Sequence, residues 1–206
     1  MKSDCGTRKK TMRTLVLDFE TTGVPAKGCS LTDPSQPHIV QLAAVLFDAD
    51  ARKVSSVSLV VHPGIEIPAG ATGVHGISTE QAWTYGIPEK GAVGLLSRLT
   101  KIATHVVTHN ASFDETIFEI AAARFGIIDC GDPVWRCTMT KAAPIVNLPP
   151  TEKMRAAGFN RPKSPKLDEC ARFFFDEEHM GAHDALADAS MCGRIYFELL
   201  ARGAWS

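Results

Sequence analysis

The sequence predicts an α/β fold, in which helices cover a central β-sheet. Three strand-like segments follow one another early in the chain, over residues 13–20, 38–47 and 53–61. After them, short apolar runs of strand length alternate with segments whose apolar residues recur at helical spacing. Strands that alternate with helices in this way build sheets with helices packed on their faces.

The first strand carries two carboxylates on one face. Because the side chains of a strand alternate, Asp18 and Glu20 point to the same side as Val16, and the residues between them are apolar. A carboxylate in such an apolar strand is costly unless a proton or a cation neutralises it. A divalent metal ion is the simplest candidate. Taken alone, the pattern is also typical of a strand that runs into a polar turn.

The second and third strands have short connections, which favour an antiparallel meander with the first. A Gly-, Pro- and Ser-rich loop precedes the second strand over residues 26–37. After the third strand, prolines and glycines predict an irregular passage. Ser78 with Gln81 three residues later resembles a helix-start capping box, so a helix is expected to begin there.

Alternating helices and strands are expected next. Residues 91–102 have the apolar spacing of an amphipathic helix, whose apolar stripe should lie on the sheet. A strand over residues 104–110 leads directly into a helix that ends near Gly126. Asp114 therefore falls in the first turn of that helix, just beyond the carboxyl end of the strand, where open α/β sheets commonly place their sites.

The last part of the chain is expected to hold a fifth strand over residues 133–139 and helices over 167–175 and 184–201. Between them, residues 147–166 form a Pro-rich and basic connection. The wider stretch 141–166 holds six positive residues and one glutamate, a net charge of +5. It is compatible with a solvated loop and with contact to a phosphate backbone, because clustered Lys and Arg are typical of nucleic-acid binding.

Length and composition indicate one soluble domain. The chain has 206 residues, of which 45% are hydrophobic and 22% charged, and a net charge of −1 that identifies no partner. Six cysteines without a CxxC pair favour a reduced, intracellular setting. No signal peptide or membrane-spanning run is recognisable. We expect a cytoplasmic protein with a flexible basic arm over residues 1–12, either solvated or bound to nucleic acid, and a single domain over residues 13–206.

Three stretches stand in a characteristic order along the chain: LVLDFETTG, VTHNASFDETIF and AHDALADA. Together they resemble the three motifs of the DEDDh family of 3′–5′ exonucleases, which includes the proofreading exonuclease of bacterial DNA polymerase III and ribonuclease T. A fourth stretch, VHGIS, is similar to the segment that contacts the terminal nucleotide in proofreading exonucleases. The resemblance covers residues 14–199. It implies a ribonuclease-H-like α/β fold, with a mixed central sheet of about five strands flanked by helices.

The resemblance implies a two-metal hydrolysis of phosphodiester bonds. It assigns the motif carboxylates to Asp18, Glu20, Asp114 and Asp188, and the motif histidine to His183. By analogy, Asp18 bridges two metal ions, Glu20 and Asp188 complete the first, and Asp114 holds the second. Oxygen ligands favour two Mg²⁺ or Mn²⁺ ions. A histidine, with an ordinary pKa near 6.5, is suited to act as the general base.

The resemblance also implies residues that contact the terminal nucleotide. The expected set consists of Thr21, Thr22, Val24, Val74, His75, Asn110 and Phe113. Phe113 is also compatible with core packing and His75 with a plain surface position, while His109 is expected to be structural. Phe19 and Gln41 stand where relatives often have Thr and Glu, but neither change removes a ligand.

The expected function is a metal-dependent 3′–5′ exonuclease that releases nucleoside 5′-monophosphates from single-stranded or frayed DNA ends. An RNA 3′-end trimming enzyme of the ribonuclease T type is the alternative, since the same five residues serve both substrates. A non-catalytic nucleic-acid-binding or scaffold subunit is a further alternative, which the complete motifs argue against. Because no polymerase tether follows the last helix, we expect a free-standing viral or repair enzyme, without membrane contact and of unpredicted oligomeric state.

Overall fold

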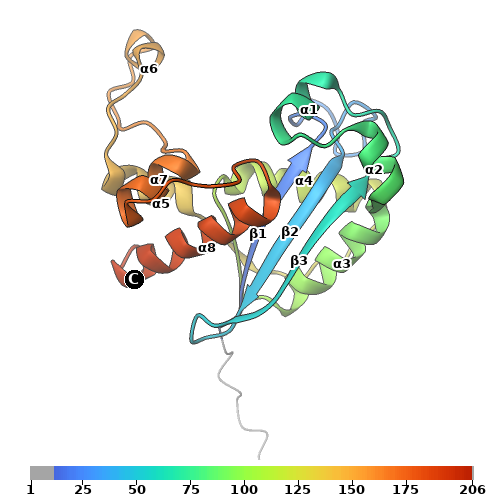
Figure 1. Ribbon diagram of the computed structural model, residues 1–206, viewed down its shortest axis with the longest axis horizontal. Helices are drawn as coiled ribbons and strands as arrows, with labels where there is room; N and C mark the ends of the chain where they lie inside the picture. Colours follow the sequence, from blue (N-terminus) through green and yellow to red (C-terminus); the bar gives the residue numbers. More distant parts are fainter. Residues whose placement is uncertain (1–11, 206) are drawn as a thin grey trace, which may run out of the picture.

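The computed structural model describes residues 12–205 and contains a six-stranded mixed sheet with helices on both faces (Figure 1). The predicted fold class is confirmed. Of the expected N-terminal arm, residues 1–11 lie outside the described residues. Within the described part of the chain, no helix is long and apolar enough to cross a membrane.

The sheet has the strand order β4-β3-β2-β1-β5-β6. Its strands are β1 (Thr14–Thr21), β2 (Ile39–Phe47), β3 (Lys53–His62), β4 (Ile87–Pro88), β5 (His105–Thr108) and β6 (Val134–Cys137). The first three form the predicted antiparallel meander, whereas β5 runs parallel to β1 and β6 parallel to β5. The unpredicted β4 adds a two-residue parallel edge beside β3, too short to show a sequence period.

The helices are α1 (Ala69–His75), α2 (Thr79–Tyr85), α3 (Glu89–Ile102), α4 (Ala111–Arg124), α5 (Thr138–Val146), α6 (Glu152–Ala156), α7 (Leu167–Phe175) and α8 (Ala185–Ala201). The capping box that starts α2 is present as predicted. Three helices were not predicted. Glycines obscure α1 within the passage expected to be irregular, Pro144 lies inside α5, and α6 has only 5 residues within the basic connection.

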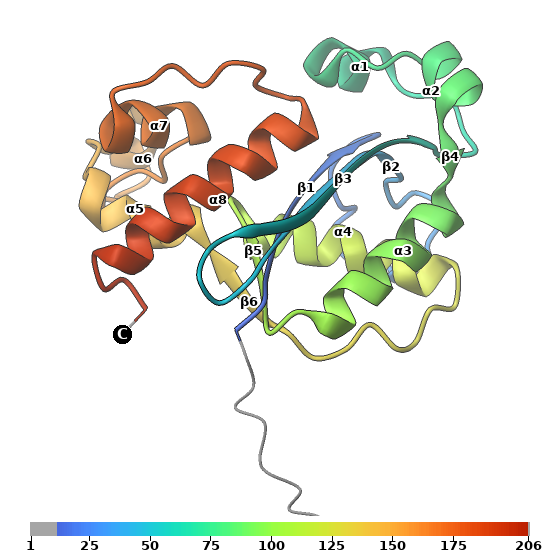
Figure 2. The same cartoon turned by 60° about the horizontal axis from the view of Figure 1, so that its bottom comes forward.

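The alternation along β1 divides the core into two layers. Leu15, Leu17 and Phe19 pack with residues of α3 and α4 on one face of the sheet. Val16 packs against α8 on the other face, where Figure 2 also shows α5 and α7 beyond α8. The predicted apolar stripe of α3 is only partly on the sheet. Val93 and Leu96 are buried, but Leu95 is 40% and Ile102 44% exposed.

The edge of the sheet at the carboxyl end of β1 is the place where the motifs meet. Because β1 and β5 are parallel neighbours, their carboxyl ends lie side by side, and α4 begins only three residues after β5. The pairing of β1 with β2 shifts register after Glu20, so that Val40 has no partner on β1. Such bulges bend a strand and re-aim its side chains. Glu20 lies close to His183 and Asp188 near the start of α8, whereas the residues after it face α1.

Candidate active site

The four predicted carboxylates come from three elements that converge at this edge. Asp18 and Glu20 lie on β1, Asp114 in the first turn of α4, and Asp188 in the first turn of α8. The charges of Asp114, Asp188 and Glu20 all raise the pKa of Asp18, which shows that the four groups share one small region. The parallel pairing of β1 and β5 brings the first two motifs together, and α8 adds the third.

Burial and neighbouring charges make Asp18, Glu20 and Asp114 poor acids. Glu20 is 8% and Asp114 4% exposed. Burial, followed by the charges of Asp188, Asp114 and Asp184, raises the pKa of Glu20 to about 8. Burial raises the pKa of Asp114 to about 7, and it also raises the pKa of Asp18 well above its ordinary range. Such a group holds protons at neutral pH until a cation displaces them.

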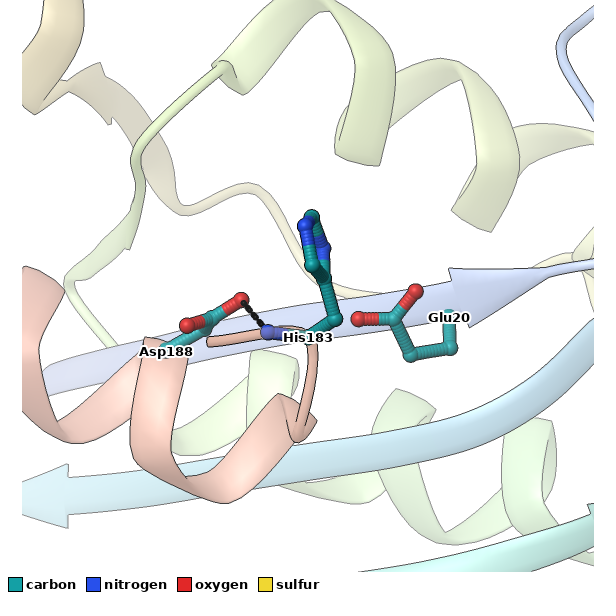
Figure 3. A group of neighbouring side chains, drawn as sticks. All are labelled: Glu20, His183 and Asp188. Atoms are coloured by element: carbon teal, nitrogen blue, oxygen red, sulfur yellow. Dashed lines mark hydrogen bonds between the residues drawn. The ribbon is translucent and has the colours of Figure 1, made fainter. Parts of the chain in front are cut away.

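Three side chains offer ligand atoms to one point in space. One atom each from Glu20, His183 and Asp188 lies within 4.8 Å of the others (Figure 3). None of the ion pairs found among residues 12–205 involves Asp18, Glu20 or Asp114. The site is therefore rich in oxygen, and three of its four carboxyls have no ion-pair partner among these residues, which fits a hard divalent ion such as Mg²⁺ or Mn²⁺.

His183 occupies an exposed loop with a special backbone conformation. Its φ is 67° and that of Gly181 is 80°, so both residues are in the left-handed region. This conformation is uncommon for a residue with a side chain. The loop is anchored at the His183 backbone, whose N–H donates to Asp188 Oδ2 at 3.2 Å (Figure 3). The imidazole thus stands between the carboxylates of Glu20 and Asp188.

A side chain from β2 fixes the start of α8. Gln41 Nε2 donates to Asp184 Oδ2 at 3.1 Å, and Ala185 N–H donates to Gln41 Oε1 at 3.0 Å. The other oxygen of Asp184 caps the helix by accepting from two backbone N–H groups. The departure Gln41 is thereby explained, because a glutamate at this position would offer no donor to Asp184.

A histidine that the sequence analysis missed supports Asp188. The side chain of His179 is 3% exposed, and its Nε2–H donates to Asp188 Oδ1. Asp188 is therefore held through both oxygens, by His179 and by the His183 backbone. The only sequence signal was a second histidine four residues before the motif histidine.

The residues predicted to meet the terminal nucleotide line one cleft. This first cleft has a volume of about 460 Å³ and is bordered by Glu20. It contains Thr21, Thr22, Val24, Val74, His75 and Phe113 from the predicted set. Val24 and Val74 are 76% and 55% exposed. Asn110 is not among the lining residues and lies exposed at the start of α4.

His75 presents a defined nitrogen in this cleft. Ile77 N–H donates to His75 Nδ1 at 3.1 Å, so the neutral ring carries its proton on Nε2. That atom is buried and makes no hydrogen bond among the described residues, although the Thr21 backbone lies nearby. Burial, together with the neighbouring His183, lowers the pKa of His75. His75 therefore presents a neutral ring at the wall of the cleft, with its Nε2–H next to the Thr21 backbone.

A buried ion pair is linked by hydrogen bonds to the wall of the first cleft. Glu89, 3% exposed, accepts from His38 Nδ1 at 2.7 Å and from Arg124 Nη1 at 3.2 Å. Arg124 Nη2 also donates to the backbone oxygens of Gln36 and Pro37. His38 N–H donates to Thr22 Oγ1 at 2.9 Å. The lip of the cleft is therefore linked to the interior.

A second cleft, of about 630 Å³, lies on the other side of Asp188. His183 and Asp188 border it together with Ser164, Pro165 and Lys166. The two clefts thus meet at the group formed by Glu20, His183 and Asp188. His109, which also lines the second cleft, bridges Thr138 Oγ1 and the backbone oxygen of Pro165, so its expected structural role is confirmed.

Comparison with known proteins places these features in a family. The family model for RNase_T, described as "Exonuclease", matches residues 15–196. DNA polymerase III subunit epsilon of Buchnera aphidicola is 26% identical over 188 residues, covering 89% of this chain and 71% of that protein. The corresponding subunit of Rickettsia conorii is 25% identical over 191 residues, covering 92% and 74%.

Solved structures share the fold. E. coli exonuclease I in complex with a dT13 oligonucleotide aligns with a TM-score of 0.69 at 20% identity, and its complex with dA16 with a TM-score of 0.71 at 20% identity. The alignments cover 93% and 94% of this chain but 41% of exonuclease I in each case, so the chain spans about two fifths of that protein.

Proposed function

The chain belongs to the exonuclease family of 3′–5′ hydrolases, and from this premise we propose that it removes nucleoside 5′-monophosphates from single-stranded or frayed 3′ ends of DNA. One observation carries the proposal. The crowded carboxylates with raised pKa values lie next to a cleft whose size and lining suit one nucleotide. The epsilon subunits and the oligonucleotide complexes of exonuclease I support DNA as the substrate.

Asp18, Glu20, Asp114 and Asp188 are the residues that would hold two Mg²⁺ or Mn²⁺ ions. Members of the family normally use divalent metals, and bound ions of this kind neutralise phosphate oxygens and lower the pKa of an attacking water. The raised pKa values of Glu20 and Asp114 reflect crowded, buried carboxyls that need a neutralising cation, and a metal ion that binds there would displace their protons. His179 would keep Asp188 in a fixed orientation.

His183 is the proposed general base. It is exposed at the junction of the two clefts and within reach of the same point as Glu20 and Asp188. An imidazole at this position can accept the proton of the attacking water and pass it to solvent. The left-handed backbone at His183 and Gly181 gives this loop a conformation that a small rotation could alter when substrate binds.

The first cleft is the proposed site of the 3′-terminal nucleotide. Val24, in the loop after β1, and Val74, in α1, offer apolar surface to the faces or edges of a base. His75, whose neutral ring lines the same cleft, would contact the terminal sugar or phosphate. Asn110, outside this lining, would act from the start of α4 if it contacts substrate.

The test uses 5′-labelled DNA and RNA oligonucleotides of identical sequence, incubated with Mg²⁺, Mn²⁺ or EDTA. We expect a ladder that shortens from the 3′ end only with metal, faster on DNA, with nucleoside 5′-monophosphates as products. Asp18→Asn controls for a contaminating nuclease and should give no ladder. Faster cleavage of RNA would identify RNA, and not DNA, as the preferred substrate. No cleavage of either would favour a binding or scaffold role.

A further inference from the structure

We propose that residues 147–166, here called the basic loop, bind the single-stranded nucleic acid on the 5′ side of the cleaved bond. This inference rests on the proposed function and extends it to a surface outside the catalytic group. The basic loop projects from the body of the protein beyond α5 and α7, with α6 at its far end (Figure 1, Figure 2).

The cations of the basic loop face solvent. Within residues 147–166, five positive side chains stand against Glu152 alone, a net charge of +4. Lys153, Arg155 and Arg161 are exposed, as is Lys166 at the base. Of the five, only Lys163 is in an ion pair among the described residues, with Glu169 at 2.6 Å. Unpaired positive charges clustered in this way attract the phosphates of a nucleic acid.

The basic loop also exposes an aromatic ring. Phe159 is 53% exposed, and the guanidinium of Arg161 lies over it at 5.9 Å from the ring centroid. Arg155 Nη1 donates to the Pro150 backbone oxygen, which orients one cation without neutralising it. An exposed aromatic ring beside Arg, in a positively charged segment, is an arrangement by which proteins stack bases without reading sequence. These features indicate a single strand, whose bases are available for stacking.

The base of the basic loop is continuous with the active site. Ser164, Pro165 and Lys166 line the second cleft together with Asp188 and His183. The Pro165 backbone oxygen accepts from His109 Nε2 at 3.0 Å, and Lys163 N–H donates to the Leu148 backbone oxygen at 3.2 Å, which joins the two legs. A strand whose last nucleotide fills the first cleft therefore continues through the second cleft towards the basic loop.

The charges of the second cleft locate the attraction in the basic loop itself. Asp168 and Glu178 also line this cleft, where they offset Lys166 and Arg172. The cleft is thus a passage rather than a phosphate-binding patch. Beyond it, the exposed cations Lys153, Arg155 and Arg161 form no ion pair among residues 12–205.

Chain length sets the nucleotide span. Seven residues separate Lys166 from Phe159, which corresponds to at most about 25 Å of extended chain. At roughly 3.4 Å per nucleotide of a stacked strand, this distance corresponds to about seven nucleotides. An oligonucleotide of about twenty is therefore long enough to reach Phe159, whereas a trinucleotide whose last nucleotide fills the first cleft leaves only two nucleotides, roughly 7 Å of stacked strand, for the second cleft that precedes the basic loop.

The experiment compares kcat/KM for a trinucleotide and a 20-mer of DNA in the full-length protein with Mg²⁺, over a range of salt concentrations. The test variant combines Lys153→Ala, Arg155→Ala and Arg161→Ala. Its control combines Arg52→Ala in the β2–β3 turn, Lys53→Ala at the start of β3 and Arg98→Ala on α3, which remove the same charge from exposed positions, although Arg52 is in a surface ion pair with Asp50. All six side chains are exposed, so neither variant disturbs the core.

We expect the test variant to have a lower kcat/KM for the 20-mer. The slope of log(kcat/KM) against log[salt] should become shallower by about 2, because each of three lost phosphate contacts contributes roughly 0.7. The trinucleotide and the control variant should behave as wild type. Phe159→Ala should lower kcat/KM for the 20-mer about fivefold without changing its salt slope, because base stacking is not an ionic interaction.

An unchanged salt slope for the 20-mer would overturn the proposal and leave the basic loop for a protein partner. Equal losses on both substrates would overturn it too, since the effect would then lie in the active site. If wild type cleaves neither substrate, the proposed function itself has failed, and the two failures are thereby distinguished.

Discussion

The first cleft and the basic loop are built in opposite ways. The lip of the cleft is tied through His38 to a buried ion pair of Glu89 and Arg124, and its nitrogen donor on His75 has a fixed tautomer. The basic loop is fastened only near its base, and its cations and Phe159 face solvent. A rigid frame suits recognition of one nucleotide by its shape. Attraction of a long strand requires positive charge but not an exact position for each charge.

The largest expected effect is a loss of catalytic turnover that leaves the first cleft and the basic loop intact. Asp18→Asn should reduce turnover about 10³-fold or more, since it removes the carboxylate that we propose is shared by both metal ions. Binding of a 20-mer should retain its salt dependence, because the basic loop is untouched. Single-turnover cleavage and fluorescence anisotropy measure the two quantities. Residual turnover within tenfold of wild type would remove Asp18 from the catalytic group.

A smaller effect should damage the first cleft alone. Glu89→Gln leaves the guanidinium of Arg124 without its partner in the interior, so we expect a loss of about 2–3 kcal/mol in the free energy of unfolding. KM for a trinucleotide should rise, while the salt slope of the 20-mer stays the same. Urea denaturation and steady-state kinetics are the measurements.

The matched control is Glu177→Gln, which breaks an ion pair whose partners are about half exposed. It should cost less than about 1 kcal/mol, as surface pairs do. If both variants lose equal stability, the buried network does not have the structural role given to it.

The smallest expected effect lies where the first cleft joins the metal group. The pKa of Glu20 is raised from an ordinary 4.5 to about 8, so the folded protein binds more protons than the unfolded chain between these pH values. The free energy of unfolding in EDTA should therefore fall as pH rises through this window. Glu20→Gln should raise it by about 1–2 kcal/mol at pH 8, after allowance for solvent screening and proton sharing, and by little near pH 4.5.

Thermal melts in EDTA at several pH values test this effect, with the exposed Glu80→Gln as a control that should follow wild type. Addition of Mg²⁺ at pH 8 should stabilise wild type more than Glu20→Gln. If Glu20→Gln is less stable than wild type at pH 8, the ionised Glu20 carboxylate does not destabilise the metal-free protein.

Local pattern explains what the sequence could predict. The alternation along β1 correctly assigned Asp18 and Glu20 to one face, and helical spacing placed Asp114 in the first turn of α4. The features that escaped prediction depend on contacts between distant residues. Glu89 and Arg124 are 35 residues apart, and nothing in either segment marks a buried charge. His179 likewise became meaningful only when the loop before α8 brought it to Asp188.

Weak local signals explain the missed elements. The helix α1 contains Gly70 and Gly73 and buries no residue, so neither propensity nor periodicity reveals it. The predicted fifth strand ended early, at Cys137, because this residue caps α5 by accepting from Thr140 N–H. The tip of the basic loop holds only the short α6, which pattern cannot distinguish from a turn.

The bridge between Gln41 and Asp184 constrains how the chain can evolve. The two positions are 143 residues apart, yet each supplies what the other lacks. Gln41→Glu alone would set carboxylate against carboxylate, and loss of Asp184 alone would leave both an amide and a helix end without partners. Substitutions at these positions are therefore epistatic, and a lineage that exchanges one must exchange the other to keep the loop of His183 in register.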